Sequence, residues 1–154
     1  MIILALTLVA WAILRKYTNN RARPNVYNSY SRNKYIASNG IDYMDGHDFE
    51  YWCADLLRYN GFTNITVTCG SGDQGVDIIA YKNGYKYAIQ CKRYSKKLGN
   101  KPVQEVNTGK TIYGCQCAAV MTNSYFTPGA VSAARAVGVM LWDRSAIEQM
   151  VKAK

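Results

Sequence analysis

The sequence predicts an α/β protein in which a mixed sheet is flanked by helices on both faces. Segments with strand-like alternation or short apolar runs occur between segments whose apolar residues lie three and four positions apart. Two strand-like segments meet at Asn83-Gly84, a strong signal for a two-residue hairpin. The later strands alternate with helices, which favours helices on both faces of the sheet. A chain of 154 residues is long enough for one such domain.

Residues 1–17 are expected to form a short membrane helix. Residues 1–14 carry no charge, and Arg15 and Lys16 follow at once. As a helix, this run covers roughly 21 Å of the ~30 Å hydrocarbon core, and interfacial placement of Arg15, Lys16 and Tyr17 closes much of the gap. No positive region precedes the run, which disfavours a cleaved signal peptide. The positive-inside rule then predicts that the rest of the chain faces the cytoplasm.

Residues 18–43 are expected to be a basic linker, because they are rich in Asn, Tyr, Ser and Arg and show no periodicity. The globular domain is expected to span residues 44–154. It opens with a helix whose apolar positions include Phe49, Trp52 and Leu56, and Gly61 suits the position just after its end. Strands are predicted at 62–69, 76–81 and 85–94, with a glycine-rich loop at 70–75 and the hairpin turn between the last two.

The second half of the domain is predicted to alternate between helix and strand. Pro102 suits the first turn of a helix, and residues 115–121 form a small and apolar run typical of a buried strand. Thr127 is a good N-cap for a helix that reaches Gly138. Residues 139–142 are predicted to be a last strand, and Asp143 to cap a final helix. The predicted order is therefore α-β-β-β-α-β-α-β-α.

The charge of the chain is strongly basic, with 19 Lys and Arg against 10 Asp and Glu. One basic cluster, at residues 15–34, contains no acid, and a second, at residues 82–110, contains only Glu105. The first cluster adjoins the apolar segment and has a membrane explanation. The second surrounds the candidate catalytic residues. Such clusters indicate either a solubilising surface or an anionic partner, which is nucleic acid or an acidic membrane.

The cysteines and histidine restrict the chemistry. Five cysteines, an odd number, favour free thiols in a reducing compartment. Cys115 and Cys117 lack the spacing and the second ligand pair of a zinc site, so core packing is the better interpretation. His47 is the only histidine, which excludes every mechanism that needs two histidines, including those of most zinc hydrolases.

The hairpin predicts a polar constellation. If Asn83 and Gly84 are the loop residues, Asp77 lies opposite Gln90, with Cβ atoms roughly 5 Å apart. Lys92 lies on the same face because side chains two positions apart share a face. A structural ion pair at the end of a strand is the alternative. Charged residues in central strands are seldom buried without a reason, which favours a functional site. Geometry alone therefore leaves both interpretations open.

The spacing of Asp77, Gln90 and Lys92 resembles the D-x(n)-(E/Q)-x-K signature of PD-(D/E)xK nucleases. More narrowly, the chain is similar to the catalytic domain of Mrr-like type IV restriction endonucleases. The matching segments are GHDFE (46–50), LLRYNGF (56–62), SGDQGVD (71–77), QCKRY (90–94) and TNSYFT (122–127). The resemblance covers residues 45–142 in the family's order. It implies a restriction endonuclease-like fold with an αβββαβ core, and a Mg²⁺-dependent (or Mn²⁺-dependent) DNA endonuclease.

The resemblance also implies a role for each site residue. Asp77 binds the metal with help from the backbone carbonyl of Cys91, and Glu50 matches a helix glutamate near the metal. Lys92 orients or deprotonates the attacking water and stabilises the transition state. Gln90 replaces the second carboxylate of many relatives and adds no negative charge. We therefore expect weaker metal binding and a single catalytic ion.

The expected DNA contacts flank this site. Arg93, Lys96, Lys97 and Lys101 are predicted to bind phosphates, which sets position without reading sequence. Ser71 and Gln74 in the glycine-rich loop are predicted to contact DNA, although residues of these types also form turns.

One departure from the family concerns specificity. Mrr-like enzymes commonly carry a separate DNA-reading domain, whereas this chain has an apolar segment and a basic linker. Methyl-specific restriction is therefore not supported by this chain alone, and specificity is expected from a partner or a homodimer, or is absent. The leading hypothesis is a membrane-tethered endonuclease that restricts foreign DNA. Alternatives are a junction-resolving or repair nuclease, an inactive DNA-binding module, and a membrane protein whose linker binds anionic lipid.

Overall fold

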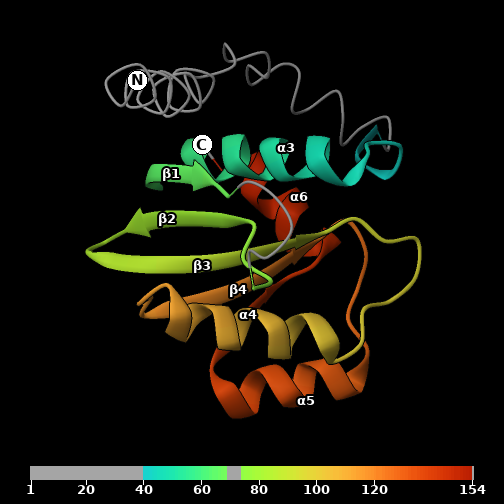
Figure 1. The fold of residues 1–154 in the computed structure, drawn as a ribbon. Coiled ribbons are helices and arrows are strands. Elements are labelled where there is room, and N and C mark those ends of the chain that lie inside the picture. Colours follow the sequence, from blue (N-terminus) through green and yellow to red (C-terminus); the bar gives the residue numbers. More distant parts are fainter. Residues whose placement is uncertain (1–39, 69–73, 154) are drawn as a thin grey trace, which may run out of the picture.

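The computed structural model describes residues 40–68 and 74–153. A five-stranded sheet occupies the centre, with helices on both faces (Figure 1). The strand order is β1-β2-β3-β4-β5; neighbours from β1 to β3 are antiparallel, and those from β3 to β5 are parallel. The predicted mixed sheet flanked by helices is therefore confirmed.

The elements follow the predicted order, with a short 3₁₀ helix added in front. They are η1 (Gly40–Asp42), α3 (Gly46–Tyr59), β1 (Thr63–Val67), β2 (Ile78–Lys82), β3 (Tyr85–Lys92), α4 (Lys101–Ile112), β4 (Cys117–Thr122), α5 (Pro128–Val137), β5 (Val139–Trp142) and α6 (Arg144–Lys152).

Local chemistry sets the helix ends. Thr127 and Asp143 accept hydrogen bonds from first-turn N–H groups of α5 and α6, as the sequence predicts. Asp45 does the same for α3. Gly61 and Gly138 follow α3 and α5 with φ of +81° and +71°, a left-handed conformation that glycine adopts without steric cost.

The core lies in two layers, one on each face of the sheet. Helices α3 and α6 cover one face, where Phe49, Trp52 and Ile147 are fully buried. Helices α4 and α5 cover the other face with smaller side chains such as Val106 and Ala130 (Figure 1). The sheet is thus shielded on both sides, and its strand ends are the natural place for a site.

The N-terminal expectations fall largely outside the described part of the chain. Within residues 40–68 and 74–153, no helix has the length and apolar character needed to cross a bilayer. The proposed anchor, residues 1–17, and most of the linker lie outside these ranges. Ile41 is fully buried in the core of the domain.

Candidate active site

The β2–β3 hairpin has the register that its turn predicts. Asn83 and Gly84 occupy the turn with φ of +51° and +81°, the left-handed values that a type I′ turn requires. Cα partners run from Lys82–Tyr85 to Ile78–Ile89, which matches the predicted pairing. The turn therefore fixes which residues of β2 and β3 share a face.

Asp77 departs from the predicted ladder, because β2 begins one residue later, at Ile78. The Asp77 N–H donates to the Ile89 carbonyl at 2.9 Å. The Asp77 carboxylate accepts a hydrogen bond from the Cys91 N–H, with Oδ2 at 2.6 Å from N. A side chain thus takes the place that a further backbone carbonyl of β2 would fill. The carboxylate is buried, at 6% exposure, beside the chain that links Gln90 to Lys92.

Gln90 lies on the face of the sheet covered by α4 and is 1% exposed. Its Nε2 donates to Glu105 Oε2 at 3.0 Å. An ionised carboxylate can only accept, so this contact fixes which end of the amide faces α4. Oε1 is buried and finds no hydrogen-bond partner among the residues that the structure describes. Buried polar atoms of this kind call for an explanation, and a bound ion or water is one.

A pocket of about 490 Å³ opens between the end of β3 and helix α4. Its lining residues are Gln74, Gly75, Gln90, Lys92, Gln104, Glu105 and Thr108. Gln90 and Lys92 therefore share one cavity, as their spacing predicts. Asp77 does not line the pocket itself, but its carboxylate contacts the backbone of the residue between them.

Two glycines let α4 approach the chain that leads into β2. A Cβ on Gly75 would lie 2.6 Å from Glu105 Cβ, and one on Gly109 would lie 2.3 Å from Val76 Cγ2. Both distances are too short for real atoms. The close packing of α4 on this segment is thus built into the sequence, and it places Glu105 over the end of the hairpin.

Glu50 approaches the same region from the opposite face of the sheet. It lies on α3, and its Oε2 is 3.1 Å from His47 Nδ1. Burial raises the pKa of the Cys91 thiol well above its usual value, with further increases from Cys53 and from the charges of Asp77 and Glu50. Both carboxylates therefore act on the residue between Gln90 and Lys92.

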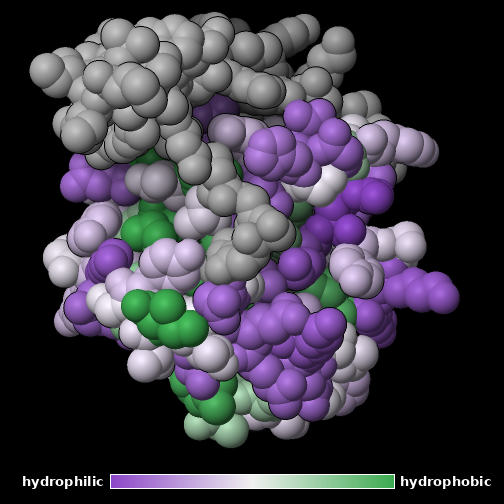
Figure 2. Space-filling model, in the orientation of Figure 1, coloured by the Kyte–Doolittle hydropathy of each residue, from purple (hydrophilic) through white to green (hydrophobic). Residues whose placement is uncertain are grey.

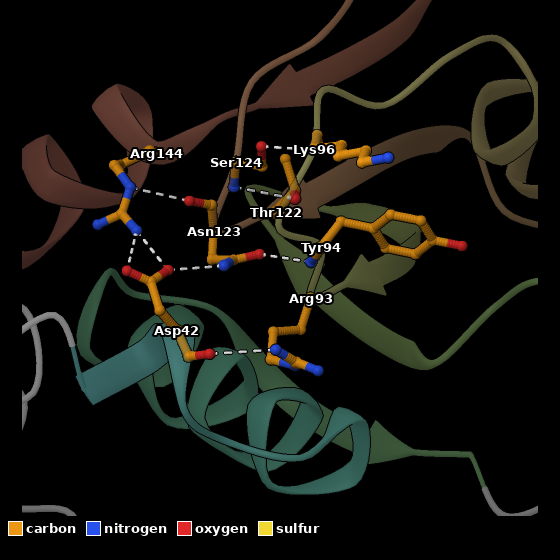
Figure 3. Close-up of polar contacts among 8 residues, drawn as sticks. All are labelled: Asp42, Arg93, Tyr94, Lys96, Thr122, Asn123, Ser124 and Arg144. Atoms are coloured by element: carbon orange, nitrogen blue, oxygen red, sulfur yellow. Dashed lines mark hydrogen bonds and ion pairs between the residues drawn. The ribbon is translucent and has the colours of Figure 1, made fainter.

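A polar network holds the chain just after Lys92 (Figure 3). Asn123 Oδ1 accepts from the Tyr94 N–H at 2.7 Å, and Asn123 Nδ2 donates to Asp42 Oδ1 at 2.7 Å. Arg144 forms an ion pair with Asp42 and donates to the Asn123 carbonyl at 2.9 Å. These contacts tie η1, β4 and α6 to the exit of β3. The sequence does not predict these roles, although Asn123 lies in a segment that carries the family resemblance.

The predicted phosphate contacts lie together along the segment from the end of β3 to the start of α4. Arg93, Lys96, Lys97 and Lys101 are all exposed. Arg93 donates to the Asp42 carbonyl at 3.1 Å, and Lys101 Nζ lies 3.7 Å from Glu105 Oε1. Figure 2 shows hydrophilic surface over the first half of α4 and beside it. Lys101 therefore brings a basic side chain close to Glu105, which lines the pocket.

Two other lysines of the basic cluster at residues 82–110 have structural contacts at the opposite end of the hairpin. Lys82 Nζ donates to the Asn60 carbonyl at 2.9 Å, and Lys86 Nζ donates to the Tyr113 carbonyl at 2.6 Å. The cluster seen in the sequence is therefore divided in space.

In the glycine-rich loop, Gln74 lines the pocket with φ of +53°, whereas Ser71 lies outside the described residues.

The oxygen donors at this site fit a hard divalent cation. They are the Asp77 carboxylate, the orphaned Gln90 Oε1 and the backbone carbonyl of Cys91. The Cys91 N–H points toward Asp77, and the carbonyl of the same residue in an extended strand points to the same edge. Among the described residues, no three His, Cys, Asp or Glu side chains group as a metal site. Any site here therefore depends on amide and backbone oxygens.

The family model for restriction endonucleases, Mrr_cat, matches residues 41–151. The chain belongs to this family. The resemblance inferred from the sequence is confirmed, and the Mrr_cat match covers nearly all of the described residues, including those that line the pocket. Restriction endonucleases generally use divalent metal ions, in keeping with the donors found here. A comparison with curated proteins found no match.

Three solved structures share the fold of this Mrr_cat domain. A protein of unknown function, AF1548, is 22% identical with a TM-score of 0.61, covering 70% of this chain and 66% of its own. The DNA modification-dependent restriction endonuclease AspBHI is 18% identical with a TM-score of 0.59, covering 79% and 33%. The MspJI restriction endonuclease, in complex with a 27-mer oligonucleotide, is 15% identical with a TM-score of 0.60, covering 84% and 34%. This chain thus spans about a third of the two restriction enzymes.

Proposed function

We propose that this chain is a metal-dependent endonuclease that hydrolyses phosphodiester bonds in DNA. The observation that carries the proposal is the shared pocket of Gln90 and Lys92, beside the buried Asp77 carboxylate, in a domain of the restriction endonuclease family. MspJI is described with an oligonucleotide and AspBHI as acting on DNA, which supports DNA as the substrate.

In the proposed mechanism, the Asp77 carboxylate, Gln90 Oε1 and the Cys91 carbonyl would hold Mg²⁺, or Mn²⁺ in its place. When bound, such an ion polarises the scissile phosphate and acidifies a water molecule. Glu50 adds negative charge from the α3 side. The low exposure of Asp77 and Gln90 strengthens their electrostatic interactions because little water screens them.

Lys92 acts on the reacting phosphate in this mechanism. Its side chain lines the pocket two residues after Gln90, so both reach the same space. The ammonium orients the attacking water and stabilises the negative charge that develops in the transition state. Arg93, Lys96, Lys97 and Lys101 bind the flanking phosphates and set the register of the duplex.

The cellular setting is proposed from the sequence. Residues 1–17 would anchor the chain in the membrane, and Arg15 and Lys16 would keep the nuclease domain in the cytoplasm. A nuclease placed there would meet incoming foreign DNA. A homodimer or a separate partner would supply specificity.

The proposal is tested by cleavage of supercoiled plasmid by the full chain with Mg²⁺ or with EDTA. We expect nicking or linearisation that needs the metal and falls at least 100-fold in Asp77→Asn and in Lys92→Met. Lys152→Met removes an exposed lysine of α6 and serves as the matched control, with full activity expected.

Undiminished cleavage by both site variants would overturn the assignment. Good DNA binding without cleavage of plain, methylated or branched DNA would favour the inactive binding module. A clear preference for branched DNA over linear duplex would identify a junction-resolving or repair nuclease instead.

A further inference from the structure

Glu105 is the one acid in the basic cluster at residues 82–110, and it lines the pocket in the structure. Among the described residues that line the pocket, it is the only carboxylate, and Lys92 is the only cation. Its Oε2 accepts from Gln90 Nε2 at 3.0 Å. A negative charge therefore stands directly beside the neutral amide of Gln90.

The contact determines the orientation of the Gln90 amide. The Nε2 group must face Glu105, since the reverse orientation would set two acceptor oxygens against each other. Oε1 is then directed away from Glu105, buried and without a partner in the described residues. Leaving a buried acceptor unsatisfied is unfavourable, and a bound cation removes that cost.

The position of Glu105 is also structurally enforced. Because residue 75 is glycine, Glu105 packs closely against the backbone there. A Cβ added at position 75 would lie 2.6 Å from Glu105 Cβ. The competing ion pair with Lys101 is weak, because the two charged atoms are 3.7 Å apart and the Lys101 side chain is 86% exposed. Glu105 is therefore held toward Gln90 by packing and remains available to the site.

We propose that Glu105 is a positioning residue that turns Gln90 Oε1 toward a divalent cation and supplies the negative charge that Gln90 lacks. The inference rests on the proposed function and deepens it. Gln90 and Glu105 then act as a pair, with the amide as the ligand and the carboxylate as its support.

The test measures binding of Mn²⁺ to the full chain by the loss of the electron paramagnetic resonance signal of free Mn²⁺, without DNA. Glu105→Gln keeps the size of the side chain and removes its charge. We expect a 10- to 100-fold weaker affinity, the range seen when groups supporting a metal ligand are removed. Glu148→Gln, on α6 at the other face of the sheet, is the matched control and is expected to stay within twofold of wild type.

The decisive variant exchanges the two groups. Gln90→Glu/Glu105→Gln returns a carboxylate to β3 and gives α4 an amide that can donate to it. We expect this double variant to recover Mn²⁺ affinity to within about threefold of wild type or better, which a merely structural role for Glu105 does not predict. Thermal unfolding of each variant verifies that the domain is folded.

Wild-type affinity in Glu105→Gln would overturn the inference, as would a double variant as weak as that single variant. These results are separable from the nuclease proposal. Plasmid cleavage that survives Glu105→Gln with unchanged Mn²⁺ binding refutes the role of Glu105 alone. Mn²⁺ binding that depends on Glu105 in a chain that cuts no DNA refutes the nuclease alone.

Discussion

Asp77 shows how one residue can end a strand and build a site at once. β2 begins only at Ile78, but Asp77 stays attached to β3 through its N–H, which donates to the Ile89 carbonyl, and through its carboxylate, which accepts from the Cys91 N–H. Cys91 lies between Gln90 and Lys92, which both line the pocket, so the Asp77 carboxylate holds the backbone between these two residues.

Cys91 gives a prediction at the scale of one residue. Burial raises the pKa of its thiol, with added effects from Cys53, Asp77 and Glu50. The unfolded chain ionises this group near pH ~8.5, while the folded chain keeps the proton. The unfolded state therefore binds fewer protons above that pH, and stability falls as pH rises, by at most about 1.4 kcal/mol per unit from this group.

We expect the free energy of unfolding to decline between pH 8 and 10 less steeply in Cys91→Ala than in wild type. Urea denaturation at each pH measures both slopes, and the slopes are compared rather than the absolute stabilities. Equal slopes would show that the thiol contributes nothing to alkaline destabilisation.

At the scale of elements, the contact of α4 with the segment entering β2 decides the shape of the pocket. Gly75 and Gly109 permit this approach: Gly75 packs against Glu105 of α4, and Gly109 of α4 packs against Val76. The opposite face is covered by α3 and α6 with larger side chains. The site is therefore positioned by α4, and α4 lies this close to the sheet because Gly75 and Gly109 have no side chain.

Gly109→Ala tests this packing. The substitution raises helix propensity, but its Cβ would meet Val76 Cγ2 at 2.3 Å and the Gln74 carbonyl oxygen at 2.9 Å. Overpacking costs about 1–3 kcal/mol, so we expect net destabilisation in urea.

Gly46→Ala is the matched control, because nothing lies within 4 Å of the added Cβ in α3. It is expected to be neutral or slightly stabilising. Equal stability of the two variants would mean that α4 can shift away from the segment at no cost.

At the scale of the whole molecule, basic residues far apart in space have different tasks. Lys82 and Lys86, beside the turn of the hairpin, donate to backbone carbonyls, whereas Lys96, Lys97 and Lys101 are exposed between the end of β3 and the start of α4. The net charge of +9 therefore does not describe a uniform surface. A polyanion would meet the second group beside the site.

Neutralising Lys96, Lys97 and Lys101 with Gln is expected to weaken DNA binding uniformly across sequences. The slope of log K against log salt should fall in magnitude by roughly 0.9 for each phosphate that the variant no longer binds. Fluorescence anisotropy over a range of salt concentrations measures the slope, with Lys152→Gln as the control. An unchanged slope in the triple variant would place the DNA elsewhere.

The sequence by itself determined the elements and the register of the hairpin. Asn83-Gly84, the caps Thr127 and Asp143, and the glycines after the helices act through local backbone preferences, which a pattern displays directly. The pairing of residues 78–82 with 85–89 follows from the turn alone. The shared face of Gln90 and Lys92 therefore follows from the order of the residues, because it needs only the alternation of an extended strand.

Only the tertiary structure decided which residues face Gln90 and Lys92. The contact of Gln90 with Glu105 depends on how closely α4 docks, and the ion pair of Asp42 with Arg144 joins residues 102 positions apart. Such contacts arise from packing between elements, which no local pattern encodes. Asp77 likewise lies just outside the regular ladder, and its carboxylate accepts the Cys91 N–H, a contact that the alternation of the strand does not predict.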